Sequence, residues 1–148
     1  MFKHILIPTD GSRLALKGVK AGARLARATG ARITGLYVVP PYVPPMYGEG
    51  AVYVPGYSVT EYRQQGARAA RKALAAVAAE ARAAGVKFMP KIVQGRPAWD
   101  GILRTARAGR CDGVVMASHG RGAIGGAILG SETQRVLAHG KIPVMVIR

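Results

Sequence analysis

Cysteine, long apolar runs and acidic residues are all scarce in this chain of 148 residues. The single cysteine, Cys111, has no partner for an internal disulfide, which is typical of a protein from a reducing compartment. No stretch reaches the roughly 18 uninterrupted apolar residues that a membrane span needs. The segment Met1–Ile7 is too short for the apolar core of a signal peptide. We therefore expect a cytoplasmic protein that does not span a membrane.

The shortage of acidic residues gives the chain a strong positive charge, with 7 Asp and Glu against 22 Lys and Arg and a net charge of +15. Such a charge favours nucleic acid, anionic lipid or phosphorylated ligands. Between residues 58 and 110, however, the cations are scattered, and they do not alternate regularly with aromatic residues as a base-stacking surface would require. An arginine-rich solubilising surface explains the same composition, so polyanion or nucleic-acid binding is an alternative rather than the main expectation.

Apolar segments of strand length alternate with longer segments of helical periodicity. Strands are expected at 3–8, 32–39, 86–93, 111–117 and 142–147, and helices at 14–30, 58–85, 97–109 and 131–139. This order predicts one α/β domain over residues 1–148, with a five-stranded parallel sheet, helices on both faces and a Rossmann-like arrangement. Pro90 predicts that the third strand lies at a sheet edge, because proline cannot donate to a strand ladder.

Residues 118–134 form a glycine-rich stretch that runs into the start of the last expected helix. Gly120–Gly125 matches the G-x-G-x-x-G pattern, but a dinucleotide turn follows the first strand and needs an acidic residue about 20 positions later. Here the stretch follows the fourth expected strand, and no Asp or Glu occurs after Glu132. No Walker A motif is present either. The pattern therefore excludes both of these nucleotide loops.

A longer spacing in the same stretch is more informative. Nine residues separate Gly120 from Gly130, and Ser131 then begins the last expected helix. The amides at a helix N-terminus, its dipole and a hydroxyl group together favour an anion such as phosphate. The alternative from the residues alone is a capped helix with a glycine-rich entry loop.

Several blocks of the sequence resemble the universal stress protein family. They are Ile5–Ser12, Gly95–Pro97, Met116–Gly122, Leu129–Ser131, Arg135–Leu137 and Pro143–Val146. The resemblance spans nearly the whole chain apart from residues 40–57. That segment holds five prolines and four tyrosines, as expected of a lid or a linker.

The family contains members that bind ATP and members that do not. The binding pattern is Gly, two residues, Gly, nine residues, Gly and then Ser or Thr; this chain has Ala117, Gly120, Gly130 and Ser131 at those positions. Ala117 departs from the pattern, which has glycine at this position. Alanine adds a methyl group near the ribose or phosphate and disfavours positive φ. The resemblance implies an ATP-binding stress-response module with Mg²⁺ carried by the nucleotide, no identified catalytic residue and at most slow hydrolysis. The alternative is a nucleotide-free interaction protein of the same fold.

The resemblance also implies which residues form the site. Thr9 and Asp10 would lie by the adenosine, Val38 would meet the adenine edge through its backbone, and Met116 would pack on the base. Simpler interpretations are a helix cap for Asp10, a core position for Met116 and a solvated loop position for Arg121. The predicted cofactor-binding set is Pro8, Thr9, Asp10, Val38, Met116, Ala117, Ser118, His119, Gly120, Arg121, Gly130, Ser131, Glu132 and Thr133.

Two further expectations concern surfaces. The resemblance implies a homodimer that pairs Ile142–Ile147 across a two-fold axis, and this apolar edge suits pairing because an open edge promotes aggregation. Closure of the 40–57 segment would bring tyrosines over a bound adenosine. These tyrosines are Tyr42, Tyr47, Tyr53 and Tyr57.

Overall fold

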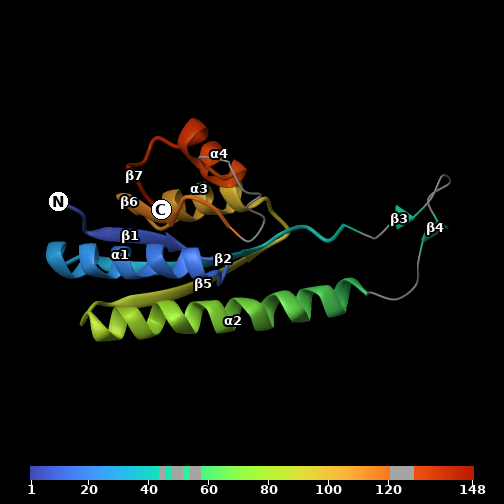
Figure 1. Ribbon diagram of the computed structural model, residues 1–148, viewed down its shortest axis with the longest axis horizontal. Helices are drawn as coiled ribbons and strands as arrows, with labels where there is room; N and C mark the ends of the chain where they lie inside the picture. The colour runs from blue at the N-terminus through green and yellow to red at the C-terminus, as the bar shows by residue number, and fades with distance from the viewer. Residues whose placement is uncertain (44–45, 48–51, 54–57, 121–128) are drawn as a thin grey trace.

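The centre of the molecule is a parallel sheet of five strands in the order β5-β2-β1-β6-β7 (Figure 1). The computed structural model describes residues 1–43, 46–47, 52–53, 58–120 and 129–148. The strands of this sheet are β1 (His4–Pro8), β2 (Arg32–Val39), β5 (Phe88–Gln94), β6 (Gly113–Ala117) and β7 (Val144–Ile147). The predicted five-stranded parallel α/β fold is confirmed.

β1 lies in the middle of the sheet and is covered on both faces. Its residues Ile5, Leu6 and Ile7 are 0% exposed, as expected for a continuous apolar run in a parallel sheet. On one side Ile5 is opposite Ile33 of β2, and on the other it is opposite Gly113 of β6. The residues after Pro8 therefore leave the sheet at the carboxyl end of its central strand.

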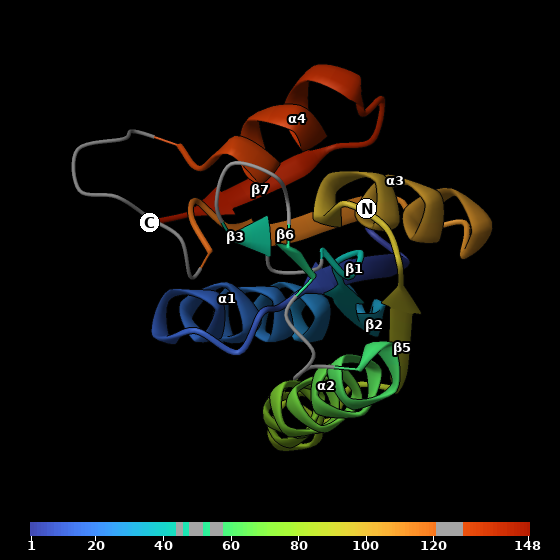
Figure 2. The same ribbon diagram turned by 90° about the vertical axis from the view of Figure 1, so that its right-hand side faces the viewer.

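Two pairs of helices cover the two faces of the sheet (Figure 2). α1 (Arg13–Thr29) and α2 (Val59–Ala83) lie on one face, and α3 (Ala98–Ala108) and α4 (Ser131–His139) lie on the other. Alternating side chains of each strand enter the two cores. Val115 packs under α1 and α2, and its neighbour Met116 packs under α3 and α4.

The signals for helix ends in the sequence match the observed caps. Ser58 and Glu61 form a complete capping box at the start of α2, with each side chain hydrogen-bonded to the other residue's backbone. Ser12 accepts from the backbone N–H of Ala15 at the start of α1, and Gly30 ends that helix at a φ of 71°, a conformation that favours glycine.

Both edges of the sheet lie where the sequence indicates. β5 is one edge strand, and Pro90 lies within it opposite Gly35 of β2. β7 is the other edge strand, and its Met145 side chain is 45% exposed. The expectation for Pro90 is confirmed, because its missing N–H falls on a strand with a single neighbour.

The segment between β2 and α2 contains a short antiparallel pair that the sequence does not predict. β3 (Met46–Tyr47) pairs with β4 (Val52–Tyr53), away from the central sheet (Figure 1). Strands of two residues are too short to show an alternating pattern. Tyr42 packs on Tyr62 of α2 with ring centroids 5.3 Å apart, whereas Tyr57 lies outside the described residues. None of the described helices is long and apolar enough to span a membrane.

Candidate functional site

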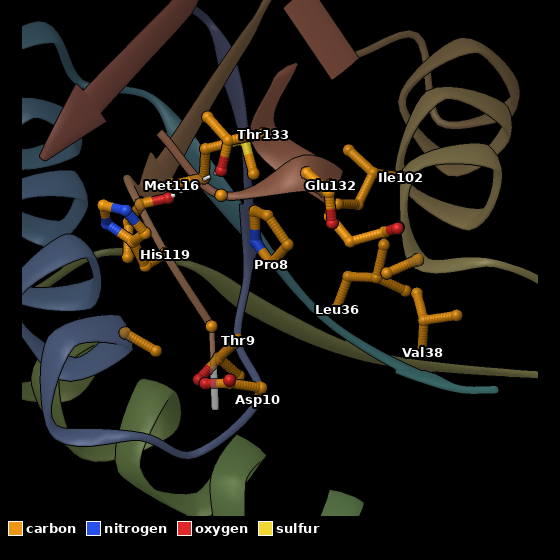
Figure 3. Close-up of a pocket in the computed structure, with 16 residues that line it drawn as sticks. Pro8, Thr9, Asp10, Leu36, Val38, Ile102, Met116, His119, Glu132 and Thr133 are labelled. Carbon is orange, nitrogen blue, oxygen red and sulfur yellow. Dashed lines mark hydrogen bonds between the residues drawn. The ribbon is translucent and has the colours of Figure 1, made fainter. Parts of the chain in front are cut away.

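A pocket of about 340 Å³ opens at the carboxyl ends of β1, β2 and β6 (Figure 3). β1 pairs with both of the other strands, and the chain builds the sheet outward from β1 in one direction before it crosses to β6 on the other side. The pocket therefore lies at the point where the strand order reverses. Open α/β sheets bind their ligands at this position.

The pocket gathers nearly all of the predicted site residues. Those that line it are Pro8, Thr9, Asp10, Val38, Met116, Ala117, His119, Gly120, Gly130, Ser131, Glu132 and Thr133. Ser118 does not line it and is only 2% exposed. Its hydroxyl lies 3.0 Å from Nδ1 of His119, and its carbonyl accepts a 2.8 Å hydrogen bond from the N–H of Gly130. Arg121 lies outside the described residues.

The turn after β1 is ordered by its own side chains. Oγ1 of Thr9 accepts from the N–H of Gly11 at 3.1 Å, and Oδ1 of Asp10 accepts from the N–H of Ser12 at 2.9 Å. The side-chain cap of α1 is Ser12, so the interpretation of Asp10 as that helix cap is wrong. Asp10 instead closes an Asx turn, which holds its carboxylate at the pocket.

The carboxylate of Asp10 lies against the backbone of Gly120. A β-carbon built at Gly120 would be 2.9 Å from Oδ2 of Asp10, closer than real contacts of this kind. A side chain at residue 120 would therefore have to shift the Asp10 carboxylate, whereas the φ of Gly120 is not in the left-handed region and places no demand for glycine. The turn after β1 and the loop after β6 therefore meet at this pair of residues.

Ala117, the position that departs from the ATP-binding pattern, ends β6 in ordinary strand conformation. Among the described residues other than glycine, only Arg110 has a positive φ, so the expected backbone penalty at Ala117 is wrong. The carbonyl of Ala117 accepts a 3.2 Å hydrogen bond from Oγ1 of Thr133, and the strand pairs it with Ile147. The difference from glycine at this position is therefore limited to the methyl group of Ala117, which is buried and lines the pocket.

Two helix N-termini meet at the pocket, and neither has a side-chain cap of its own. α4 is capped by Gly130 and α3 by Pro97, both without a side-chain hydrogen bond. At α3, Oε2 of Glu132 accepts from the N–H of Trp99 at 2.7 Å. The protein thus supplies a carboxylate to one helix N-terminus from the first turn of the other.

One wall of the pocket is apolar and includes residues that the sequence did not single out. Leu36, Val38 and Ile102 lie together on one side, across the pocket from His119 (Figure 3). The lining residues missed from the sequence are Ala15, Leu36, Ala98 and Ile102. Strand alternation from Val38 would have found Leu36. Ala98 and Ile102, four residues apart on α3, share one helix face but carried no polar signal.

Two observations concern metal ligands and the cysteine of the chain. No group of three or more His, Cys, Asp or Glu that could hold a metal ion occurs among them. Burial, followed by the nearby Asp112 carboxylate, raises the pKa of the Cys111 thiol to about 11. Cys111 is absent from the pocket lining. In the pocket, an apolar wall faces polar groups and two helix N-termini.

The family model for the universal stress protein family matches residues 1–148. The chain is 34% identical over 152 aligned positions to the universal stress protein in the QAH/OAS sulfhydrylase 3′ region of Thermus aquaticus, with all of both chains covered. The chain belongs to the universal stress protein family. A second member of the family, universal stress protein MJ0531 of Methanocaldococcus jannaschii, is 30% identical and is covered over 83% of its length by the whole of this chain.

Solved structures of the family share the fold. Universal stress protein UspA from Lactobacillus plantarum aligns with a TM-score of 0.78 at 22% identity, covering 99% of this chain and 97% of its own. A universal stress protein in complex with cAMP aligns with a TM-score of 0.73 at 21% identity, covering 99% of this chain and 97% of its own. The universal stress protein of Archaeoglobus fulgidus in complex with dAMP aligns with a TM-score of 0.67 at 16% identity, covering 100% of this chain and 98% of its own. Two structures of this fold are thus nucleotide complexes.

Proposed function

We propose that this universal stress protein binds ATP in the pocket at the carboxyl ends of β1, β2 and β6, and acts as a nucleotide-dependent stress-response module. The observation that carries the proposal is the division of the pocket into an apolar wall and a polar side next to a helix N-terminus. A nucleotide has the same division between its base and its phosphates. The volume of about 340 Å³ lies within the range of small-ligand sites.

The apolar wall suits the adenine base. Val38 and Ile102 lie on one side of the pocket, and Met116 also lines it (Figure 3). Burying an aromatic ring against such side chains removes apolar surface from water and favours binding. These residues come from β2, α3 and β6, so the base would contact three elements on the α3 and α4 side of the sheet.

The turn after β1 suits the ribose. The Asx turn holds Asp10 at the pocket, where its carboxylate is placed to accept hydrogen bonds from ribose hydroxyl groups. The same carboxylate is 2.9 Å from the β-carbon position of Gly120, so any side chain at residue 120 would displace it. Gly120 and Asp10 would therefore act together in shaping this part of the site.

The N-terminus of α4 suits the phosphates. The first N–H groups of a helix have no partner within the helix, and Gly130 gives α4 no side-chain cap. Ser131 and Thr133 line the pocket within the first turn and bring hydroxyl groups. In contrast to α3, which receives the carboxylate of Glu132, α4 would receive its negative charge from the ligand.

Magnesium fits this arrangement as part of the nucleotide. Among the described residues no cluster of three acidic, histidine or cysteine groups would hold the ion. Mg²⁺ commonly binds through substrate phosphates and water with one or two carboxylates. When bound, it would neutralise phosphate charge, and Asp10 and Glu132 are the carboxylates that line the pocket.

Two structures of the same fold support a nucleotide as the ligand, because they contain cAMP and dAMP. Both ligands carry an adenine base, and the proposal extends this base preference to the present chain. A triphosphate is favoured over a monophosphate here because the glycine spacing from Gly120 to Gly130-Ser131 is retained.

The single tryptophan of the chain gives a direct test of this proposal. Trp99 lies in the first turn of α3 and is joined to Glu132 at the pocket, so its fluorescence should change when the site fills. We expect saturable changes with ATP and weaker binding of GTP, whose base has different polar edges. No saturable change with any adenine nucleotide would favour a nucleotide-free interaction protein of the same fold.

A further inference from the structure

The outer face of α1 is a line of positively charged side chains. Of its seven exposed residues, five are lysine or arginine, and the other two are Leu16 and Ala28. The cations form what we call the α1 basic stripe. Its members are Arg13, Lys17, Lys20, Arg24 and Arg27.

The spacing of the α1 basic stripe follows the helix repeat. Steps of four, three, four and three residues keep the five side chains within an arc of about 80° at 3.6 residues per turn. At 1.5 Å per residue the stripe is about 21 Å long. The opposite face of α1 is buried against the sheet through residues such as Val19 and Ala23. The stripe is therefore a rigid, straight row of charge on the surface.

No acidic residue reduces this charge within the helix, since α1 contains neither Asp nor Glu. Ion pairs within the described part of the chain join Arg96 and Arg104 to Asp100, and Arg135 to Glu132. These pairs lie on and beside α3 and α4, on the other face of the sheet. α1 itself thus contributes charge of only one sign to this surface.

The cations of α2 make a useful contrast. They are Arg63, Arg68, Arg71, Lys72 and Arg82. The helix repeat spreads them over about 180°, and α2 also carries Glu61 and Glu80. Although α1 and α2 each have five cations, only α1 concentrates them in one line without acidic residues.

We propose that the α1 basic stripe binds duplex nucleic acid through the phosphate backbone, without sequence selectivity. A row of five cations about 21 Å long complements the regular row of phosphates along a duplex groove edge. The stripe offers no aromatic side chain for base stacking and no Asn or Gln for reading base edges, because α1 contains none of these residues. This interaction goes beyond nucleotide binding and does not depend on it.

A duplex fits the stripe better than an anionic membrane does. Helices that bind membrane surfaces place an apolar face among the lipid chains. The apolar face of α1 is already used in the core, where Val19 is 1% exposed and Ala26 is 0% exposed. Only Leu16, at 37% exposure, adds a large apolar group to the outer face. Purely electrostatic binding to a charged polymer is what this surface supports.

Salt dependence and two matched triple variants test the proposal. One variant is Lys17→Gln, Lys20→Gln and Arg24→Gln on the stripe, and the control is Arg68→Gln, Arg71→Gln and Lys72→Gln on α2. All six residues are exposed, and each variant loses three charges. Binding of a short mixed-sequence DNA duplex is measured without nucleotide by fluorescence anisotropy between about 50 and 200 mM salt. Circular dichroism confirms that both variants are folded.

If all five cations contact phosphates, the slope of log K against log salt for the unmodified protein is about −4.5, a loss of about 500-fold over this range. The stripe variant should fall to a slope of about −1.8, and the α2 control should keep the original slope. Equal losses in the two variants would overturn the proposal in favour of net charge alone. Absence of binding at low salt, or stripe-dependent binding to phosphatidylserine vesicles without binding to the duplex, would also overturn it.

Discussion

The carboxylate of Glu132 in α4 accepts a hydrogen bond of 2.7 Å from the backbone N–H of Trp99 in α3. This contact joins the N-termini of two helices that border the same pocket, and it supplies α3 with the cap that Pro97 lacks. The rings of Trp99 and His139 add a second contact between these helices, with centroids 5.0 Å apart. The α3 side of the pocket is thus fixed in place by α4.

Removing the Glu132 carboxylate should loosen this connection. We expect Glu132→Ala to lower the free energy of unfolding by about 1 kcal/mol, because an N-terminal N–H of α3 loses its acceptor. Glu132→Gln keeps a neutral acceptor and should lose about half as much. Urea denaturation of the three proteins measures the difference. Equal stability of the alanine variant and the parent would show that the contact contributes nothing.

Acidic pH should destabilise the protein through His4. This side chain is 6% exposed, with Nε2 2.8 Å from Oγ1 of Thr34 and Nδ1 3.0 Å from the carbonyl of Gly109. Burial, and then the Arg32 guanidinium, lower the pKa of His4 below its ordinary 6.5. Below pH 6.5 the unfolded chain therefore binds more protons than the folded protein, and the free energy of unfolding falls as the pH falls.

The contribution of His4 can be separated from that of the carboxyl groups. The pKa of Asp112 is raised by partial burial, but hydrogen bonds from the N–H groups of His4 and Lys3 outweigh this and lower it below 3.8. Its stabilising contribution is lost only in stronger acid. Urea denaturation between pH 5 and 6.5 should show a shallower decline for His4→Gln than for the parent. Parallel declines would rule out His4 as the cause.

We predict that the open edge of β7 forms a two-fold dimer interface, as the resemblance in the sequence implies. Met145 is 45% exposed on this edge, and Met89 is 61% exposed on the edge strand β5 at the other side of the sheet. Light scattering should give 31.0 kDa for the parent (2 × 15.5 kDa) and 15.5 kDa for Met145→Glu, because two-fold pairing brings the new charges together. Met89→Glu should remain dimeric. A dimer that survives Met145→Glu and dissociates with Met89→Glu would place the interface on β5.

The backbone conformation of Ala117 predicts how much its departure from the ATP-binding pattern affects the affinity for ATP. Because Ala117 has ordinary strand φ, the cost of alanine there is limited to its methyl group at the pocket wall. Ala117→Gly should therefore raise ATP affinity only a few-fold. Gly120→Ala should lower it by about tenfold, or ~1.4 kcal/mol, because its β-carbon would lie 2.9 Å from Oδ2 of Asp10. Calorimetry measures both, and a larger effect at residue 117 than at residue 120 would contradict this ranking.

The sequence predicted the sheet well because its signals are local and agree with one another. The apolar run Ile5–Ile7, the capping box at Ser58 and Pro90 each report a burial or backbone requirement that the structure retains. Strand ends are predicted less closely, since the strand expected at 86–93 is β5 at Phe88–Gln94. That shift reflects the weak boundary signal of a half-exposed edge strand.

The sequence predicted the polar side chains that line the pocket, whereas four of the apolar lining residues were missed. Glycine spacing and turn chemistry drew attention to Asp10, Gly120 and Ser131, whereas Leu36 and Ile102 look like ordinary core residues in the sequence. The link from Glu132 to Trp99 spans 33 positions and depends on how α3 and α4 pack, which no local pattern contains. The resemblance to the family also predicted Ser118 as a binding residue, but this residue is buried and does not line the pocket.

Isothermal titration of the purified protein with ATP, in the presence and absence of Mg²⁺, tests the central claim most directly. The account predicts saturable heat with one ATP bound per chain. The affinity of Gly120→Ala for ATP should be about tenfold lower. Absence of heat at millimolar ATP, in a protein shown to be folded and free of co-purified nucleotide, would contradict it.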